Sequence, residues 1–229
     1  MEVQYVYWAN LCPELEIDLE PKPLLVDIAK SQSQYKGQNW LSCPAIKDKN
    51  YNTFLTHIPR DLEVKFENNF VYTNDKMVSP RQGLYEKSYA FNWDIKRIFF
   101  SELPQVMEVT PAYLHKTSYS QYGHAPSGAF DIGRWFRPSF PTFQLWPEEN
   151  IFLAKKDEAH LYFNFPSNKK IVLKEFYFTD TLQEIMQLNV DHKNIIPKQS
   201  LDSIYNMFET TKRKKTVLSE IIKNIKEHK

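Results

Sequence analysis

The chain has 229 residues, of which 42% are hydrophobic and 25% charged, as is ordinary for a globular protein with one sizeable core. A formal net charge of +1 gives no global reason to expect nucleic acid or an anionic membrane as a partner. Aromatic residues make up 15% of the chain, and because Phe, Tyr and Trp favour half-buried pleated surfaces, they indicate β-structure.

The first 180 residues are predicted to form mostly short strands. Residues 61–66 show the clearest pattern, because Leu62, Val64 and Phe66 alternate with charged residues, as in a strand with one solvent-facing side. Frequent prolines between the apolar runs are typical of a sandwich or barrel. Residues 166–170 are predicted to form a hairpin turn. The predicted strands are residues 3–9, 52–58, 61–66, 96–101, 106–114, 142–146, 151–154, 160–165 and 170–178.

Helices are expected towards the two ends of the chain. Residues 23–30 are a weak candidate, Thr179–Thr181 offer N-caps for a second helix, and Ser200 offers the N-cap of a third. The fold class is therefore predicted to be mainly β: an antiparallel β-sandwich of jelly-roll type over residues 1–180, followed by a helical segment over residues 181–229.

The last of these helices has an apolar stripe, which something must cover. Its apolar positions are Leu201, Ile204, Tyr205, Phe208, Leu218, Ile221, Ile222 and Ile225. We expect another chain to cover the stripe, either a second copy or a partner, with packing back on the sandwich as the alternative. The basic run Lys212–Lys215 is expected to be a solvated helix face, so nucleic acid binding is not expected.

Two cysteines, Cys12 and Cys43, each precede a proline. They do not form a disulfide framework, so we expect two buried free thiols. No signal peptide and no apolar run of about 18 residues is apparent, so we expect a protein that is neither secreted nor inserted in a membrane.

Three of the five glycines, Gly123, Gly128 and Gly133, lead into the run Arg134–Arg137, which reads Arg-Trp-Phe-Arg. One interpretation is a ligand site, in which the two arginines bind a carboxylate or phosphate and an aromatic ring stacks on a flat ligand. The other is a sheet corner, whose arginines bond backbone carbonyls or Asp131; we favour this one because structural aromatics are commoner than ligand sites. If the run is extended, its two arginines face opposite sides and have different roles.

The histidines show no metal-binding spacing, because no two lie at i, i+2. A site assembled from His57, His115, His124 and His160 stays open, with His115 and His124 as weak metal candidates. No phosphate loop, nucleophile elbow or paired-cysteine motif is present. We therefore predict no cofactor and no metal, and favour a protein that is not an enzyme.

Four short motifs together resemble an uncharacterised protein family encoded by tailed marine phages. They are residues 40–45 (WLSCPA), 52–54 (NTF), 58–61 (IPRD) and 131–138 (DIGRWFRP). The resemblance covers about residues 1–180. It implies a viral accessory or virion-associated protein, located in the cytoplasm of the infected host or in the virion.

Two functions remain open from the sequence. The favoured one is a binding or assembly protein that contacts a protein partner or associates with itself. Its candidate contact residues are Arg134, Trp135, Arg137, His124 and Asp131. The alternative is a jelly-roll enzyme or small-ligand-binding protein, with a pocket near His115, His124, Arg134 and Arg137.

Overall fold

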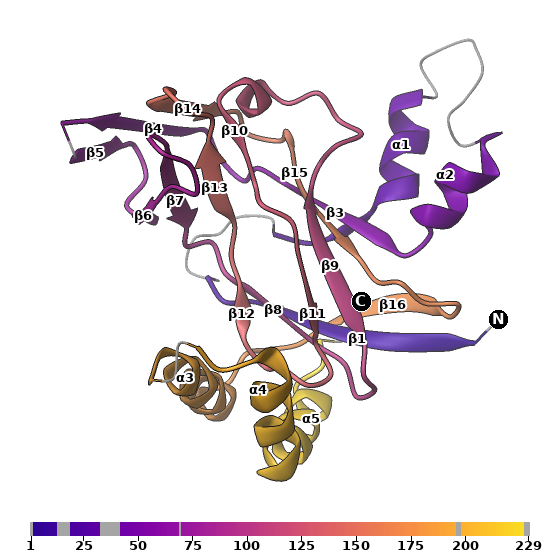
Figure 1. The fold of residues 1–229 in the computed structure, drawn as a ribbon. Coiled ribbons are helices and arrows are strands. Elements are labelled where there is room, and N and C mark those ends of the chain that lie inside the picture. Colours follow the sequence, from indigo (N-terminus) through magenta and orange to yellow (C-terminus); the bar gives the residue numbers. More distant parts are fainter. Residues whose placement is uncertain (1, 13–18, 33–41, 69, 196–197, 227–229) are drawn as a thin grey trace.

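The computed structural model describes residues 2–12, 19–32, 42–68, 70–195 and 198–226. Strands form the body of the molecule, and three helices lie together at one end (Figure 1). The strands are β1 (Val3–Asn10), β2 (Lys22–Pro23), β3 (Thr53–His57), β4 (Leu62–Glu67), β5 (Phe70–Thr73), β6 (Val78–Gln82), β7 (Tyr89–Trp93), β8 (Arg97–Phe100), β9 (Val106–Pro111), β10 (Gly123–His124), β11 (Gly128–Asp131), β12 (Pro138–Ser139), β13 (Thr142–Leu145), β14 (Ile151–Ala154), β15 (Ala159–Asn164) and β16 (Lys170–Glu175). The helices are α1 (Leu24–Gln32), α2 (Pro44–Lys49), α3 (Asp180–Ile195), α4 (Leu201–Thr210) and α5 (Arg213–Lys223).

The strands of the described residues form four sheets, which confirms the mainly β prediction. Their orders are β12-β8-β1-β16, here called the base sheet, β11-β9-β15-β3-β2, β10-β13-β7-β6 and β14-β4-β5. Pairing between the described strands is antiparallel except between β1 and β16, which run parallel from Val3 opposite Lys170 to Trp8 opposite Glu175. The predicted hairpin at residues 166–170 is wrong, because this segment joins β15 to β16 in a different sheet.

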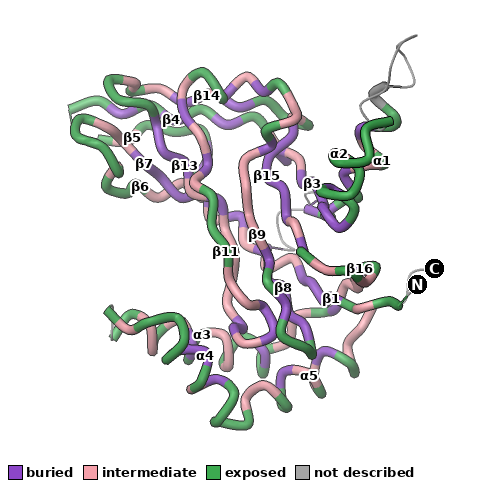
Figure 2. The backbone as a smooth tube through the Cα atoms, turned by 45° about the vertical axis from the view of Figure 1, so that its right-hand side comes forward, coloured by how far each residue is buried: buried purple, intermediate pink, exposed green. Residues whose placement is uncertain are grey.

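A central hydrophobic core takes side chains from all four sheets. Along β1 the alternation of side chains divides them between two cores: Val6 and Trp8 contribute to the central core, and Tyr7 lies on the opposite face. Figure 2 shows buried residues along β1, β8, β3 and β15, where sheets are covered on both sides. The middle of the base sheet, formed by β8 and the second half of β1, is therefore buried between the central core and the helices.

Helices α3, α4 and α5 cover the outer face of the base sheet. Phe208 of α4 and Ile221 of α5 are buried in one cluster with Phe100 and Phe176 of the β region. The expectation that another chain covers this stripe is wrong, because the chain itself covers most of it. Leu201 and Ile222 stay exposed. The single predicted helix is also divided in two, since Lys212 adopts a left-handed conformation with φ 57°.

The prediction of two buried thiols holds for Cys12 and is wrong for Cys43. Cys12 is buried, and its thiol donates a hydrogen bond to the carbonyl of Asp94 at 3.6 Å. Cys43 is exposed because it precedes the six-residue helix α2, which buries none of its side chains. No helix in the described part of the chain is long and apolar enough to cross a membrane.

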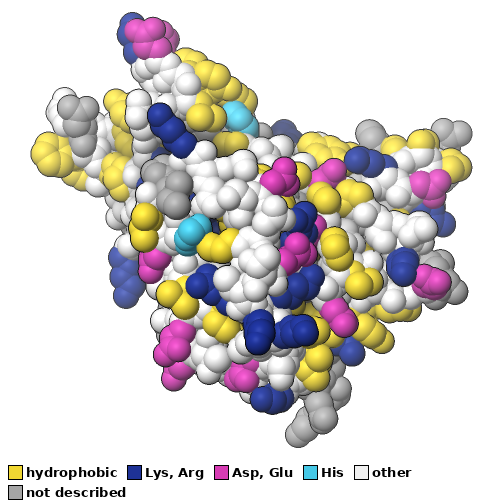
Figure 3. All heavy atoms as spheres, turned by 60° about the horizontal axis from the view of Figure 1, so that its bottom comes forward, with side chains coloured by type: hydrophobic (Ala, Val, Ile, Leu, Met, Phe, Trp, Pro, Cys, Tyr) yellow, Lys and Arg dark blue, Asp and Glu magenta, His cyan; other side chains and the backbone are white. Residues whose placement is uncertain are grey.

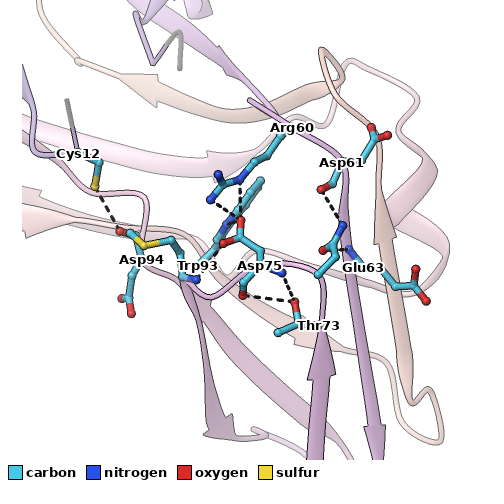
Figure 4. A network of polar contacts seen from close by, with 10 residues as sticks. Cys12, Arg60, Asp61, Glu63, Thr73, Asp75, Trp93 and Asp94 are labelled. Atoms are coloured by element: carbon cyan, nitrogen blue, oxygen red, sulfur yellow. Dashed lines mark hydrogen bonds and ion pairs between the residues drawn. The ribbon is translucent and has the colours of Figure 1, made fainter. Parts of the chain in front are cut away.

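A buried carboxylate holds the loop between β5 and β6. Asp75 accepts hydrogen bonds from Arg60 Nε and Trp93 Nε1, both at 2.8 Å, and from the backbone N–H of Met77 at 2.9 Å. Arg60 and Trp93 both point at this carboxylate (Figure 4). The network shows how this protein places an arginine next to a buried acid where the arginine has a structural role.

Candidate ligand groove

Two of the three clustered glycines are required by close backbone contacts. A Cβ on Gly133 would lie 2.2 Å from the carbonyl oxygen of Leu103, and one on Gly123 would lie 2.2 Å from that of Gln144. A Cβ on Gly128 would meet open space. None of the three has positive φ, so close approach and not unusual torsion explains the first two.

Arg134 is fixed to helix α4. Its Nε lies 3.2 Å from a carboxylate oxygen of Glu209, its Nη2 donates to Asn206 at 3.0 Å, and its guanidinium lies 5.1 Å from the centre of the Tyr205 ring. These contacts occupy the charge and the planar face of the guanidinium. Arg134 therefore links the β region to α4 and does not offer a free binding group.

The predicted pairing of an arginine with Asp131 is wrong. The Oδ1 atom of Asp131 accepts the backbone N–H groups of Gln105 and Gly133, both at 2.9 Å. The backbone N–H of Asp131 in turn donates to the hydroxyl of Tyr205 at 2.9 Å. Asp131 thus fixes the turn before Arg134. The chain bends again at Arg134, and residues 135–137, for which the alternation argument assumed an extended strand, are not part of a strand.

Arg137 has no such partners. Its guanidinium lies 5.0 Å from the Trp135 ring centre, and it makes no hydrogen bond or ion pair with the described residues. Its Nε and the Nε1 of Trp135 are both buried without a hydrogen-bond partner. Burial lowers the pKa of the Arg137 guanidinium.

A second cation lies on the same tryptophan. The Nζ of Lys193, from helix α3, lies 5.7 Å from the Trp135 ring centre. Burial, followed by repulsion from Arg137, lowers the pKa of the Lys193 ammonium. Figure 3, in which the helical end faces the viewer, shows Lys and Arg side chains near the middle of this face, with Asp and Glu side chains among them. The surroundings of Trp135 are therefore positively charged and partly dehydrated.

Arg137 and Trp135 line a cavity that continues into a second one. The first has a volume of about 240 Å³ and the second about 370 Å³. Phe130, Ser139, Phe140 and Thr142 line both, so we treat them as one groove, here called the Phe130 groove. Its lining residues come from β9, β11 and β15, from the sheet β10-β13-β7-β6, and from the segments that join these strands. No Asp or Glu is among the described residues that line it.

Arg81, on β6, lines the far part of the groove and is exposed. With the Asn92 amide oriented to donate to Thr142, the Asn92 carbonyl oxygen accepts from Arg81 Nε at 2.6 Å and Nη2 at 2.8 Å. This partner is neutral, so the guanidinium charge of Arg81 is not compensated by a carboxylate.

The other candidate residues lie elsewhere. His124 stacks on Trp146 with ring centres 4.6 Å apart, and burial lowers its pKa. His115 lies 2.6 Å from the Tyr162 hydroxyl and 3.2 Å from Asp27, which also lies 3.8 Å from His57. Of the four residues expected around one pocket, only Arg137 lines the groove. In the described ranges, no three His, Cys, Asp or Glu side chains are placed to hold a metal ion.

Sequence reasoning found Trp135 and Arg137 but missed Lys193, Phe130 and Arg81. These residues come from α3, β11 and β6, and no spacing in the sequence relates them to the Arg134–Arg137 run. Searches with protein-family models, against curated proteins and against solved structures give no match to this chain.

Proposed function

We propose that this protein binds a small anionic molecule in the Phe130 groove. Arg137 and Lys193 hold its carboxylate or phosphate group, and the aromatic rings of Phe130 and Trp135 contact its apolar part. The observation that carries this proposal is the Arg137 guanidinium, a partly buried charge at the wall of a cavity, with a buried Nε that has no hydrogen-bond partner and no acid among the residues that line the cavity. The proposal takes up the small-ligand alternative from the sequence in place of the favoured protein partner, and it limits the ligand to small anions.

An unpaired buried charge costs free energy unless a partner of opposite charge is supplied. Elsewhere this chain supplies one from within: Arg60 has Asp75, and Arg134 has Glu209. Arg137 has no such carboxylate, although only two residues separate it from Arg134. A bound carboxylate or phosphate would supply the missing charge and two or more acceptors for the guanidinium.

The second cation supports the same ligand charge. Two cations facing one tryptophan repel each other, and this repulsion contributes to the lowered pKa of Lys193. An anion between them would remove the repulsion and raise that pKa, so binding and protonation of Lys193 favour each other. Anion affinity is therefore expected to fall as the pH rises through the lowered pKa of Lys193.

The lining supports binding more than catalysis. Apart from the arginines, its polar side chains in the described residues are Gln82, Ser127, Ser139, Thr142 and Gln144. No carboxylate, histidine or thiol of that lining stands next to a hydroxyl to act as its base.

Isothermal titration calorimetry of the full chain with benzoate, phenyl phosphate, inorganic phosphate and neutral benzamide tests the proposal. We expect benzoate and phenyl phosphate to bind, inorganic phosphate to bind more weakly, and benzamide not to bind. Arg137→Gln should weaken benzoate binding by about tenfold or more, because a charge-assisted hydrogen bond is lost.

Arg134→Gln is the matched control, since it removes the neighbouring arginine without touching the groove. It should leave benzoate affinity within about twofold, measured at a temperature where the variant is folded. Equal binding of benzamide and benzoate, or an unchanged affinity in Arg137→Gln, would show that the groove does not select anions through Arg137.

A further inference from the structure

The Phe130 groove has an arginine without a carboxylate partner in each of its two parts. Arg137 lines only the first part and Arg81 only the second, and four residues line both parts. We propose that the ligand is an elongated molecule with an anionic group at both ends and an apolar middle. This inference rests on the proposed function and adds the second charge and the shape of the ligand.

The two ends carry different kinds of cationic site. At the Arg137 end the guanidinium is partly buried, lacks a hydrogen-bonding partner and lies near Lys193. At the Arg81 end the guanidinium is exposed and already bonded to the neutral Asn92 amide. Anion binding should therefore be strong and specific at the first end, and weaker and salt-dependent at the second.

The middle of the groove is suited to an apolar spacer. Phe130 and Phe140 line both parts, and Ala90, Val109 and Leu161 add aliphatic surface to the second. The hydroxyl groups of Ser139 and Thr142 also line both parts. A chain or ring system without charges can thus cross the groove while its two anionic groups remain at the arginines.

Paired carboxylate probes test the second charge. We expect one member of the series adipate, suberate and sebacate to bind about fivefold tighter than the monocarboxylate of equal length, hexanoate, octanoate or decanoate. This advantage should shrink as salt is added, because Arg81 is exposed. The dicarboxylate whose length matches the groove should show the largest advantage.

Two variants separate the two proposals. Arg81→Gln should abolish the advantage of the dicarboxylate while leaving monocarboxylate affinity unchanged. Arg137→Gln should weaken both kinds of probe. If monocarboxylates bind through Arg137 but no dicarboxylate binds more tightly, the second charge is refuted and the proposed function stands. If neither kind of probe binds, both proposals fail.

Discussion

Arg134 and Arg137 belong to one short run of sequence, but their surroundings differ completely. Arg134 has a carboxylate, an amide and an aromatic ring, all on α4. Arg137 contacts the Trp135 ring and lines a cavity, and the Lys193 ammonium lies near the same ring. One arginine therefore contributes to the fold, and the other is available to a ligand.

The difference is decided by segments remote in the sequence. Helix α4 brings Glu209 and Asn206 to Arg134, whereas α3 brings a lysine towards Arg137. A motif of arginines and aromatics is compatible with both outcomes. The packing of the helices on the base sheet decides which arginine finds a hydrogen-bonding partner within the chain. This packing is a property of the tertiary structure.

The largest effect is expected from the turn that sends the two arginines to different places. Gly133→Ala should lower the free energy of unfolding by about 3 kcal/mol, because the new methyl group meets the Leu103 carbonyl in a packed corner. Gly128→Ala is the matched control and should be neutral or stabilising by about 0.5 kcal/mol, since its Cβ meets open space. Urea denaturation measures both. Equal loss of stability in the two variants would mean that Gly133 does not fix this corner.

The two arginines themselves should differ in stability by a smaller amount. Arg134→Gln should cost about 1–2 kcal/mol, because a partly screened ion pair and a ring contact are lost. Arg137→Gln should change stability by less than about 0.5 kcal/mol or raise it, because it removes a partly buried charge that has no carboxylate partner. Thermal and urea unfolding of both variants decide the matter. A larger loss in Arg137→Gln would assign Arg137 to the fold.

The smallest expected effect is on the pH dependence of stability, and it comes from a buried side chain outside the Phe130 groove. His160 is fully buried between Trp93 and Phe143, both ring nitrogens lack a hydrogen-bond partner, and burial holds its pKa well below the usual value. The unfolded chain therefore takes up a proton near pH 6.5 that the folded chain does not, so stability falls as the pH drops below that value.

We expect this one group to account for about 1 kcal/mol of lost stability between pH 6.5 and 5.5. His160→Leu should remove that part of the slope and leave the remainder, which comes from other groups such as His57 and His124, whose pKa values burial also lowers. Unfolding curves measured at both pH values provide the test. An unchanged slope in the variant would mean that His160 is protonated in the folded state.

The sequence predicted the β region better than the connections within it. Alternation identified β4, and each of the other predicted strands overlaps an observed one. The strand β7 was not predicted. Its residues Ala90, Phe91, Asn92 and Trp93 are all buried, so polar and apolar residues do not alternate along it. Sheet partners were not predictable, because β15 and β16 are neighbours in sequence but belong to different sheets.

The candidate site was predictable only in part. Trp135 and Arg137 were identified because arginine and aromatic residues are concentrated in one short run of the sequence, residues 134–137. The other features of the site depend on long-range packing. They are the absence of an acid beside Arg137, the position of Lys193 from α3 and the position of Arg81 from β6. The helical stripe shows the same limit. Its apolar spacing was correct, but the sequence favoured another chain as its cover, and packing back on the β region was only the alternative.

The parallel pairing of β1 with β16 has a consequence for how the chain acquires its structure. The first strand finds this neighbour only after residue 175 has been synthesised, because the partners are Val3–Trp8 and Lys170–Glu175. The helices that cover this sheet come later still. Contacts between such distant parts of a chain slow folding, and we expect folding times in the range of milliseconds to seconds. A ribosome-bound fragment ending before β16 should leave β1 without one of its two neighbours, a nascent state open to chaperones.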